Sequence, residues 1–241
     1  MSAARPVYRY RPLGSALFGG PVGGRRPAPR IALGDTASLL FPASVQRWSS
    51  LVQQYAGSIP LPFLLAWIQK ESAGNPCSYT SLHESGIWQL MPPGNTNVAG
   101  TTEAALRAAC VGATQTASRP LTADEATHQV KSGLQYVNWA KDYARQYVNW
   151  PESNPDFWKM VKMVHVAPAR VKEYAPGASS WAEFRRRAAA GGDTPASWLD
   201  NAEWVGNFGT GGGASSALAI LVFAGLVAGG TVLYLRSRSR R

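Results

Sequence analysis

Residues 61–93, LPFLLAWIQKESAGNPCSYTSLHESGIWQLMPP, contain the pattern that decides the fold. Pro60 and Pro62 stand where proline favours a helix start, and an apolar run follows them. The run ends at the turn-forming residues 74–76, Gly-Asn-Pro. The pattern therefore predicts a buried helix that carries one carboxylate, Glu71, close to its C-terminal end.

The position of Glu71 has two interpretations. A helix C-terminus favours a cation over a carboxylate, and partial burial against Trp67 or Trp88 would raise the pKa of Glu71. A glutamic acid that keeps its proton near neutral pH is what glycosidic cleavage requires of a general acid. On spacing alone, an ordinary surface glutamate at a fraying helix end is the simpler interpretation.

Helical patterns extend on both sides of this stretch, and no convincing alternating strand is present. We therefore expect a mainly α fold. Thr122 with Glu125, and Ser180 with Glu183, have the spacing of capping boxes that open helices. The long helix after Thr122 has five apolar positions at helical spacing, which are Val130, Leu134, Val137, Ala140 and Ala144. Further helices are expected from about Ser44, over 104–110 after a Thr102 cap, and over 197–205.

Composition divides the chain into five parts. We expect residues 1–35 to be a flexible basic arm rich in Pro and Gly, 36–207 a helical domain, and 208–216 a Gly/Ser linker. Residues 217–235 are predicted to form a transmembrane helix, and 236–241 a basic tail. The arm lacks an apolar stretch of useful length, so it does not have the pattern of a secretory signal.

The net charge of +10 belongs to the two ends of the chain. Residues 1–34 contain six arginines and no acid, and residues 236–241 contain four arginines. The remaining 14 basic side chains equal the 14 acidic ones, so the body is neutral. A nucleic-acid-binding domain would be expected to hold its basic patch on the folded surface. The distribution therefore argues against a specific nucleic-acid partner.

The segment between Ala217 and Leu235 has 19 consecutive uncharged residues. At 1.5 Å per residue it would span roughly 28 Å, enough for the core of a lipid bilayer. The arginines that follow predict a cytoplasmic C-terminus and place the body on the opposite side of the membrane. Gly225 and Gly229 form a G-x-x-x-G pattern through which two such helices could pair as a homodimer.

The chain has two cysteines, Cys77 and Cys110, and their spacing matches no zinc motif. We expect no metal and no cofactor. The cysteines are either a disulfide or two buried thiols. A disulfide would close a loop of about 33 residues and stabilise the fold by roughly 3–4 kcal/mol.

Residues 61–93 resemble the lytic transglycosylases with a lysozyme-like fold. The family pattern is a proline-led helix ending in Glu-Ser, then Gly/Ala-Gly-Asn-Pro, a loop, and Gly-Leu-Met-Gln-(Leu/Ile)-Met-Pro. Here these elements are Glu71-Ser72, residues 73–76 (AGNP) and residues 86–92 (GIWQLMP). The preceding helix, with Trp48 and Tyr55, also resembles the family, and the whole match covers about 50 residues closely.

The resemblance implies an activity on peptidoglycan. Glu71 would protonate the glycosidic oxygen between N-acetylmuramic acid and N-acetylglucosamine, and would then take the proton of the C6 hydroxyl as a 1,6-anhydro ring closes. This intramolecular nucleophile explains how one carboxylate suffices. Ser72 would orient Glu71. The substrate-binding residues would be Ser72, Gly86, Gln89, Met91 and His165.

Two departures from the family pattern leave alternatives open. Trp88 replaces a methionine, and the third family block, Ala-Tyr-Asn-Ala-Gly, is only echoed in residues 163–168, with His165 at the asparagine position. A hydrolysing muramidase that uses Glu84 as a second carboxylate is one alternative. A non-catalytic protein that binds peptidoglycan is another. With the membrane segment at the C-terminus, we expect a virion-associated phage enzyme, or else a secretion component.

Overall fold

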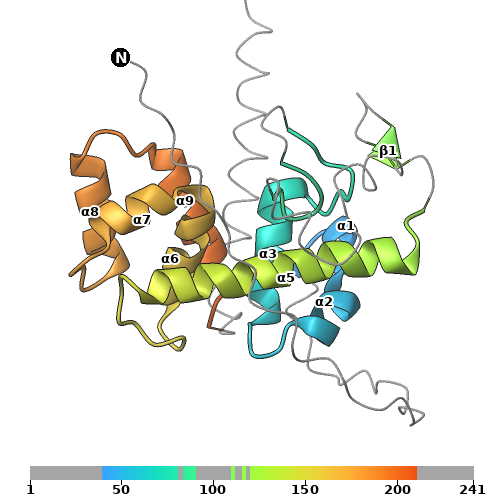
Figure 1. Cartoon of the computed structure of the whole chain (residues 1–241), viewed down its shortest axis with the longest axis horizontal. Helices are drawn as coiled ribbons and strands as arrows, with labels where there is room; N and C mark the ends of the chain where they lie inside the picture. Colours follow the sequence, from blue (N-terminus) through green and yellow to red (C-terminus); the bar gives the residue numbers. More distant parts are fainter. Residues whose placement is uncertain (1–39, 81–83, 91–109, 112–115, 118–119, 211–241) are drawn as a thin grey trace, which may run out of the picture.

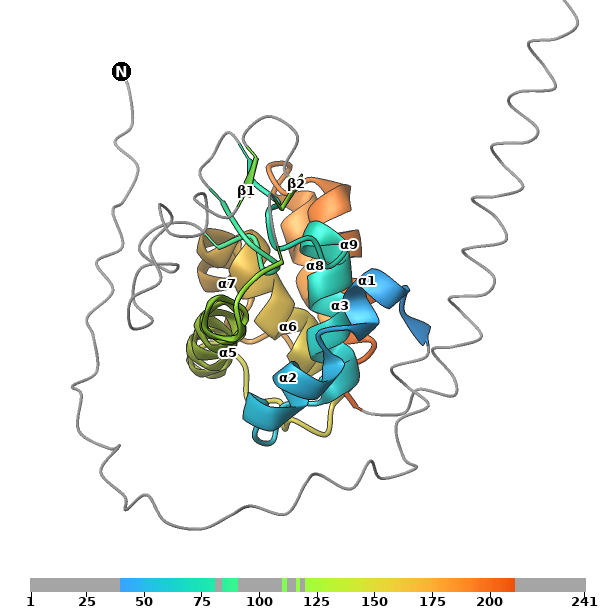
Figure 2. The ribbon, with the colours of Figure 1, turned by 90° about the vertical axis from the view of Figure 1, so that its right-hand side faces the viewer.

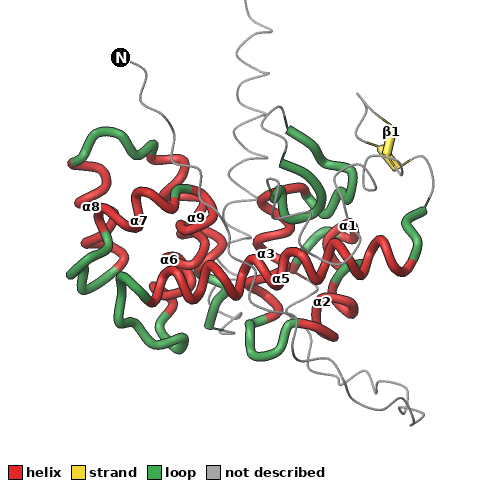
Figure 3. Tube along the Cα trace, viewed as in Figure 1, coloured by secondary structure: helices red, strands yellow, loops and turns green. Residues whose placement is uncertain are grey.

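The computed structural model describes residues 40–80, 84–90, 110–111, 116–117 and 120–210, and these are mainly helical (Figures 1 and 3). The expectation of a mainly α fold is therefore confirmed. The helices are α1 (Ala43–Gln46), α2 (Ser49–Tyr55), α3 (Leu61–Ser72), α5 (Ala123–Arg145), α6 (Pro155–Val166), α7 (Pro168–Tyr174), α8 (Trp181–Ala190) and α9 (Ala196–Gly206).

Residues 61–68 of helix α3 are all apolar, and this part of the helix is buried accordingly. Every residue from Phe63 to Ile68 is shielded from solvent, as expected for a helix in the centre of a domain. The helix ends at Ala73, which adopts a left-handed conformation with φ 51°. At Gly74, φ is +79°, and a Cβ there would lie 2.2 Å from the carbonyl oxygen of Ser44. The close approach of α1 to this turn therefore requires glycine.

Helix α5 begins with the predicted capping box. The Thr122 side chain accepts the Glu125 amide, and the Glu125 carboxylate accepts the Thr122 amide. The five predicted inward positions of α5 are all buried. In Figure 1 this helix runs across the whole domain, and Figure 2 views it nearly end-on.

Helix α6 is central, and the sequence patterns did not predict it. It packs against α5, α7, α8 and α9 (Figure 2). Asn154 caps its first turn by accepting the Asp156 amide, and Pro155 occupies the start. The buried side chains of α6 point in several directions and include Lys162, so no single apolar stripe exists for a periodicity argument to find.

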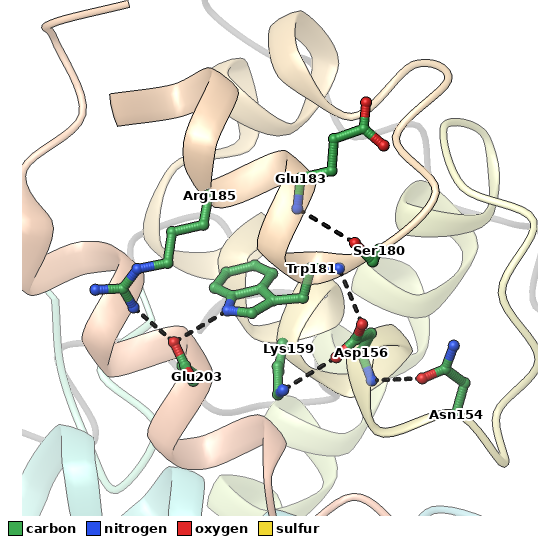
Figure 4. A network of polar contacts seen from close by, with 8 residues as sticks. All are labelled: Asn154, Asp156, Lys159, Ser180, Trp181, Glu183, Arg185 and Glu203. Atoms are coloured by element: carbon green, nitrogen blue, oxygen red, sulfur yellow. Dashed lines mark hydrogen bonds and ion pairs between the residues drawn. The ribbon is translucent and has the colours of Figure 1, made fainter. Parts of the chain in front are cut away.

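Polar contacts join the start of α6 to α8 and α9 (Figure 4). Asp156 accepts the Trp181 amide at 2.9 Å and pairs with Lys159 at 3.0 Å. The Trp181 indole and Arg185 both donate to Glu203 of α9. The second predicted capping box is half present. Ser180 accepts the Glu183 amide, whereas the Glu183 carboxylate accepts from Ser179.

Two expectations about segment boundaries differ from the structure. Cys110 lies in a strand, β1 (Cys110–Val111), which pairs antiparallel with β2 (Thr116–Ala117), so the helix predicted over 104–110 is wrong at its end. Strands of two residues are too short to show alternation. Phe208 packs against Phe41 and Trp204, so the core continues into the segment assigned to the linker.

Among residues 40–80, 84–90 and 120–210, no helix is both long and apolar enough to cross a membrane. The predicted arm over 1–35 lies outside the described residues. The predicted span over 217–235, with Gly225 and Gly229, lies outside them as well.

Candidate active site

The two sequence blocks of the predicted site meet at Ser72. Its buried hydroxyl donates to the carbonyl oxygen of Ile87 at 2.9 Å and accepts the Gly74 amide at 3.2 Å. It also lies 3.2 Å from the carbonyl oxygen of Ile68. All three partners are backbone groups. Ser72 therefore joins the end of α3 to segment 84–90, and its hydroxyl is not used to orient Glu71 as predicted.

Gln129 of α5 attaches the same two blocks to the long helix. Its buried carboxamide accepts the Ile87 amide at 3.1 Å and donates to the carbonyl oxygen of Pro76 at 3.2 Å. The indole of Trp88 donates to the Gln129 backbone carbonyl at 3.0 Å. Gln129 is therefore a structural centre of the site, and no local sequence signal distinguished it from a surface glutamine.

Gly86 and Gln89 make close contacts within the protein, around segment 84–90. A Cβ on Gly86, where φ is +78°, would lie 3.0 Å from the Gln129 side-chain oxygen. The Gln89 carboxamide is buried and donates to the carbonyl oxygens of Gly86 and Ser78. Both residues therefore shape the loop in this structure, where sugar contacts were predicted. Met91 lies outside the described residues.

Glu71 does come together with His165, as predicted, and with a residue that the sequence did not indicate. Lys162 Nζ contacts Glu71 Oε1, and His165 Nε2 lies 3.6 Å from Glu71 Oε2. Both partners are on α6, one helical turn apart. The Glu71 side chain is 15% exposed, and that of Lys162 is 0% exposed.

The expected rise in the pKa of Glu71 is wrong for the free protein. Burial does raise this pKa, but the ammonium of Lys162 and the imidazole of His165 outweigh burial and hold it well below its usual value. Glu71 is therefore a carboxylate at neutral pH in this arrangement, and it must receive a proton before it can act as an acid.

The other titratable groups around Glu71 are shifted mainly by burial. Burial lowers the pKa of Lys162 and of His165, and the charge of Lys162 lowers that of His165 further. Burial and the nearby carboxylates raise the pKa of Tyr136, so its hydroxyl keeps its proton. His165 is therefore neutral at pH 7.

Glu84 contributes to the electrostatics of this cluster. Its carboxylate accepts the Thr80 hydroxyl at 2.9 Å, and its charge contributes to the pKa shifts of Tyr136, Lys162 and His165. A second carboxylate therefore influences the Glu71 surroundings through space, and its part in a hydrolytic mechanism stays a prediction.

A file of half-buried aromatic rings runs from this cluster along α5 and just past its C-terminal end. Tyr136 packs edge-on against His165 with ring centroids 5.5 Å apart. Successive centroids from Tyr136 through Trp139 and Tyr143 to Tyr147 are separated by 5.1, 5.4 and 5.2 Å. We call these four residues the α5 aromatic file. Half-exposed rings with an apolar body and a polar edge suit ligands that are themselves amphipathic, such as sugars.

Cys77 is disulfide-bonded, and the chain has one other cysteine, Cys110. The side chain of Cys110 is outside the described part of the structure. No group of three or more His, Cys, Asp or Glu side chains that could hold a metal ion occurs among the residues placed in the structure.

The residues that sequence reasoning missed are Lys162, Tyr136 and Gln129. One signal was available for Lys162. It stands in the run FWKMVKMVHV, where a lysine on any face of a strongly apolar helix requires a charged partner.

Comparisons of the chain with protein-family models, with curated proteins and with solved structures gave no match.

Proposed function

We propose that this chain is a lysozyme-like lytic transglycosylase that cleaves the glycan strands of peptidoglycan. The observation that carries the proposal is the position of Glu71. Its carboxylate is largely withdrawn from water, contacts two titratable residues of α6, and lies where the α5 aromatic file begins. The resemblance of residues 61–93 to the family supports the same assignment.

In this mechanism Glu71 is the single acid and base, and it takes up a proton before cleavage because it is ionised in the free protein. It protonates the glycosidic oxygen, and the C6 hydroxyl of the muramic acid then attacks C1 as Glu71 takes the hydroxyl proton. Holding nucleophile and electrophile in one molecule replaces the second carboxylate of ordinary glycosidases. In this proposal His165, whose Nε2 lies 3.6 Å from Glu71 Oε2, contacts the sugar beside Glu71.

The test is mass spectrometry of the muropeptides that the purified full chain releases from peptidoglycan. We compare the wild type with Glu71→Gln and with Glu84→Gln. The proposal expects anhydromuramoyl products from the wild type and from Glu84→Gln, and none from Glu71→Gln. Products with reducing ends that disappear in Glu84→Gln would instead identify a hydrolysing muramidase.

A non-catalytic peptidoglycan-binding protein is the second candidate, and one observation favours it. The ion pair with Lys162 neutralises Glu71, as a purely structural carboxylate would be neutralised. Binding of the wild type to purified peptidoglycan, without release of any product by the wild type or by either variant, would select this candidate.

We also propose that residues 217–235 anchor the protein in a membrane, with the helical domain on the cell-wall side and the C-terminus in the cytoplasm. The uncharged segment followed by arginines supports this orientation. Partition of the full chain into the detergent phase, lost when 217–241 are deleted, would test the anchor. Detection of the chain in purified virions would test the phage origin.

A further inference from the structure

Lys162 is a fully buried cation that packing alone does not explain. Its side chain has 0% exposure, and its Nζ lies 4.3 Å from the ring centroid of Trp67 and contacts Glu71 Oε1. Removal of an ammonium group from water costs several kcal/mol unless close partners compensate. A carboxylate and the face of an indole ring are the two partners found here.

We infer that Glu71 and Lys162 form a pair that holds one proton, and that this proton is on Lys162 in the free protein. During the reaction Lys162 transfers it to Glu71. This transfer rests on the proposed function, because only a reaction that needs an acid requires Glu71 to be protonated. Lys162 is thus a positioning residue, since it acts on the substrate through Glu71.

The neighbouring groups do not gain or lose protons between pH 5 and 8, so only the proton of the Glu71–Lys162 pair is available for transfer. His165 on α6 is neutral because burial and Lys162 lower its pKa. Tyr136 on α5 keeps its proton because burial raises its pKa. Among the remaining charges, Lys70 on α3 lowers the pKa of Lys162 and Glu84 raises it, so the two act in opposite directions.

The proton balance closes over one turnover. When a glycan covers the exposed edge of Glu71, its carboxylate loses contact with solvent, and the neutral amine and neutral acid become favourable. The proton passes from Nζ to the Glu71 carboxylate and then to the glycosidic oxygen, which also takes the electron pair of the broken C1–O bond. The C6 oxygen forms the new bond to C1, and its proton returns through Glu71 to Lys162.

The first experiment follows the Glu71 carboxyl carbon by ¹³C NMR in the full chain, with Glu71→Gln to assign its signal. In the wild type we expect no titration of this signal from pH 5 to 8. In Lys162→Met we expect it to titrate within this range, because burial then raises the Glu71 pKa without an opposing ammonium group. Lys159→Met, which changes the other lysine of α6, should leave the signal as in the wild type. Titration of the wild-type carboxyl within this range, or the same pKa in Lys162→Met, would overturn the inference.

Lys162→Arg separates the charge of Lys162 from its proton. Arginine keeps the positive charge but does not release a proton at any pH of interest. We therefore expect Glu71 to remain ionised in Lys162→Arg, while release of anhydromuramoyl products falls at least about 100-fold, the usual minimum contribution of a general acid. If Lys162→Met does not fold, this variant and ¹⁵N NMR of the Lys162 side chain carry the test. A wild-type rate in Lys162→Arg would overturn the inference.

The pH profile of product release gives a readout that a merely structural lysine would not change. The wild type should be flat across pH 5–8, whereas Lys162→Met should lose activity about tenfold per pH unit above the pKa of its Glu71. Expected titrations without any product from the wild type would refute the proposed function and support the one-proton pair. Anhydromuramoyl products with a Glu71 carboxyl that titrates normally would support the function and refute the pair.

Discussion

The indole of Trp88 lies directly against Gly133 of α5, so that a Cβ at position 133 would be 2.1 Å from Trp88 Cε2. An alanine in a helix interior is normally about 1 kcal/mol more stable than glycine. Here the added methyl group must displace a buried ring, and overpacking of this kind costs about 1–3 kcal/mol. We therefore expect Gly133→Ala to lower the free energy of unfolding, measured by urea denaturation.

A second substitution tests whether the contact itself is the cause. Trp88→Met removes the ring from Gly133, at the cost of the hydrogen bond to Gln129 and some packing. In that background Gly133→Ala should be close to neutral or stabilising. An equal loss of stability in both backgrounds would show that the contact between Trp88 and Gly133 is not responsible.

Ser72→Ala should destabilise the protein and leave the reaction chemistry unchanged. The substitution removes a buried hydroxyl that bonds to the Ile87 carbonyl and the Gly74 amide. A buried polar group left without its partner costs about 1–3 kcal/mol. Thermal unfolding measures the loss, and assays well below the unfolding temperature should give a wild-type pH profile. A shifted profile would instead support the predicted role of Ser72 in orienting Glu71.

Glu183 should make stability depend on pH in the acid range. Hydrogen bonds from the backbone and hydroxyl of Ser179, together with Arg187, lower its pKa from 4.5 to about 2. A carboxyl whose folded pKa is depressed stabilises the fold above its unfolded pKa, and this contribution is lost as the pH falls from about 4.5 to about 2. The unfolding temperature of Glu183→Gln should therefore fall less than that of the wild type between pH 5 and pH 2. Parallel curves for the two proteins would contradict this.

Much of the fold was predictable because its signals are local. The prolines at the start of α3, the capping box at Thr122 and the spacing of apolar residues in α5 each act within a few residues. Helix α6 was missed because it is buried on several sides and interrupted by lysines. Its burial depends on α5 and α9, which no single-segment pattern contains.

The candidate site was predictable only where a motif existed. Glu71 and His165 were identified by resemblance, and the structure brings them to 3.6 Å. Lys162 is 91 residues from Glu71 in sequence, and its pairing is a tertiary contact. The direction of the Glu71 pKa shift therefore could not be predicted, because burial alone would have raised it and the lysine reverses the sign.

Trp139 offers the most direct test of the α5 aromatic file, since it lies between Tyr136 and Tyr143 with centroids 5.1 and 5.4 Å away. If sugars stack on the file, Trp139→Ala should remove about 1–2 kcal/mol of apolar contact and weaken binding roughly 5- to 30-fold. Binding to purified peptidoglycan is measured in a Glu71→Gln background, so that strands are not cleaved. The matched control is Trp198→Ala, which removes an exposed tryptophan of α9 and should leave binding unchanged. Equal affinities for the two variants, with near-ultraviolet circular dichroism showing that both are folded, would mean that the file packs the core and does not contact the glycan.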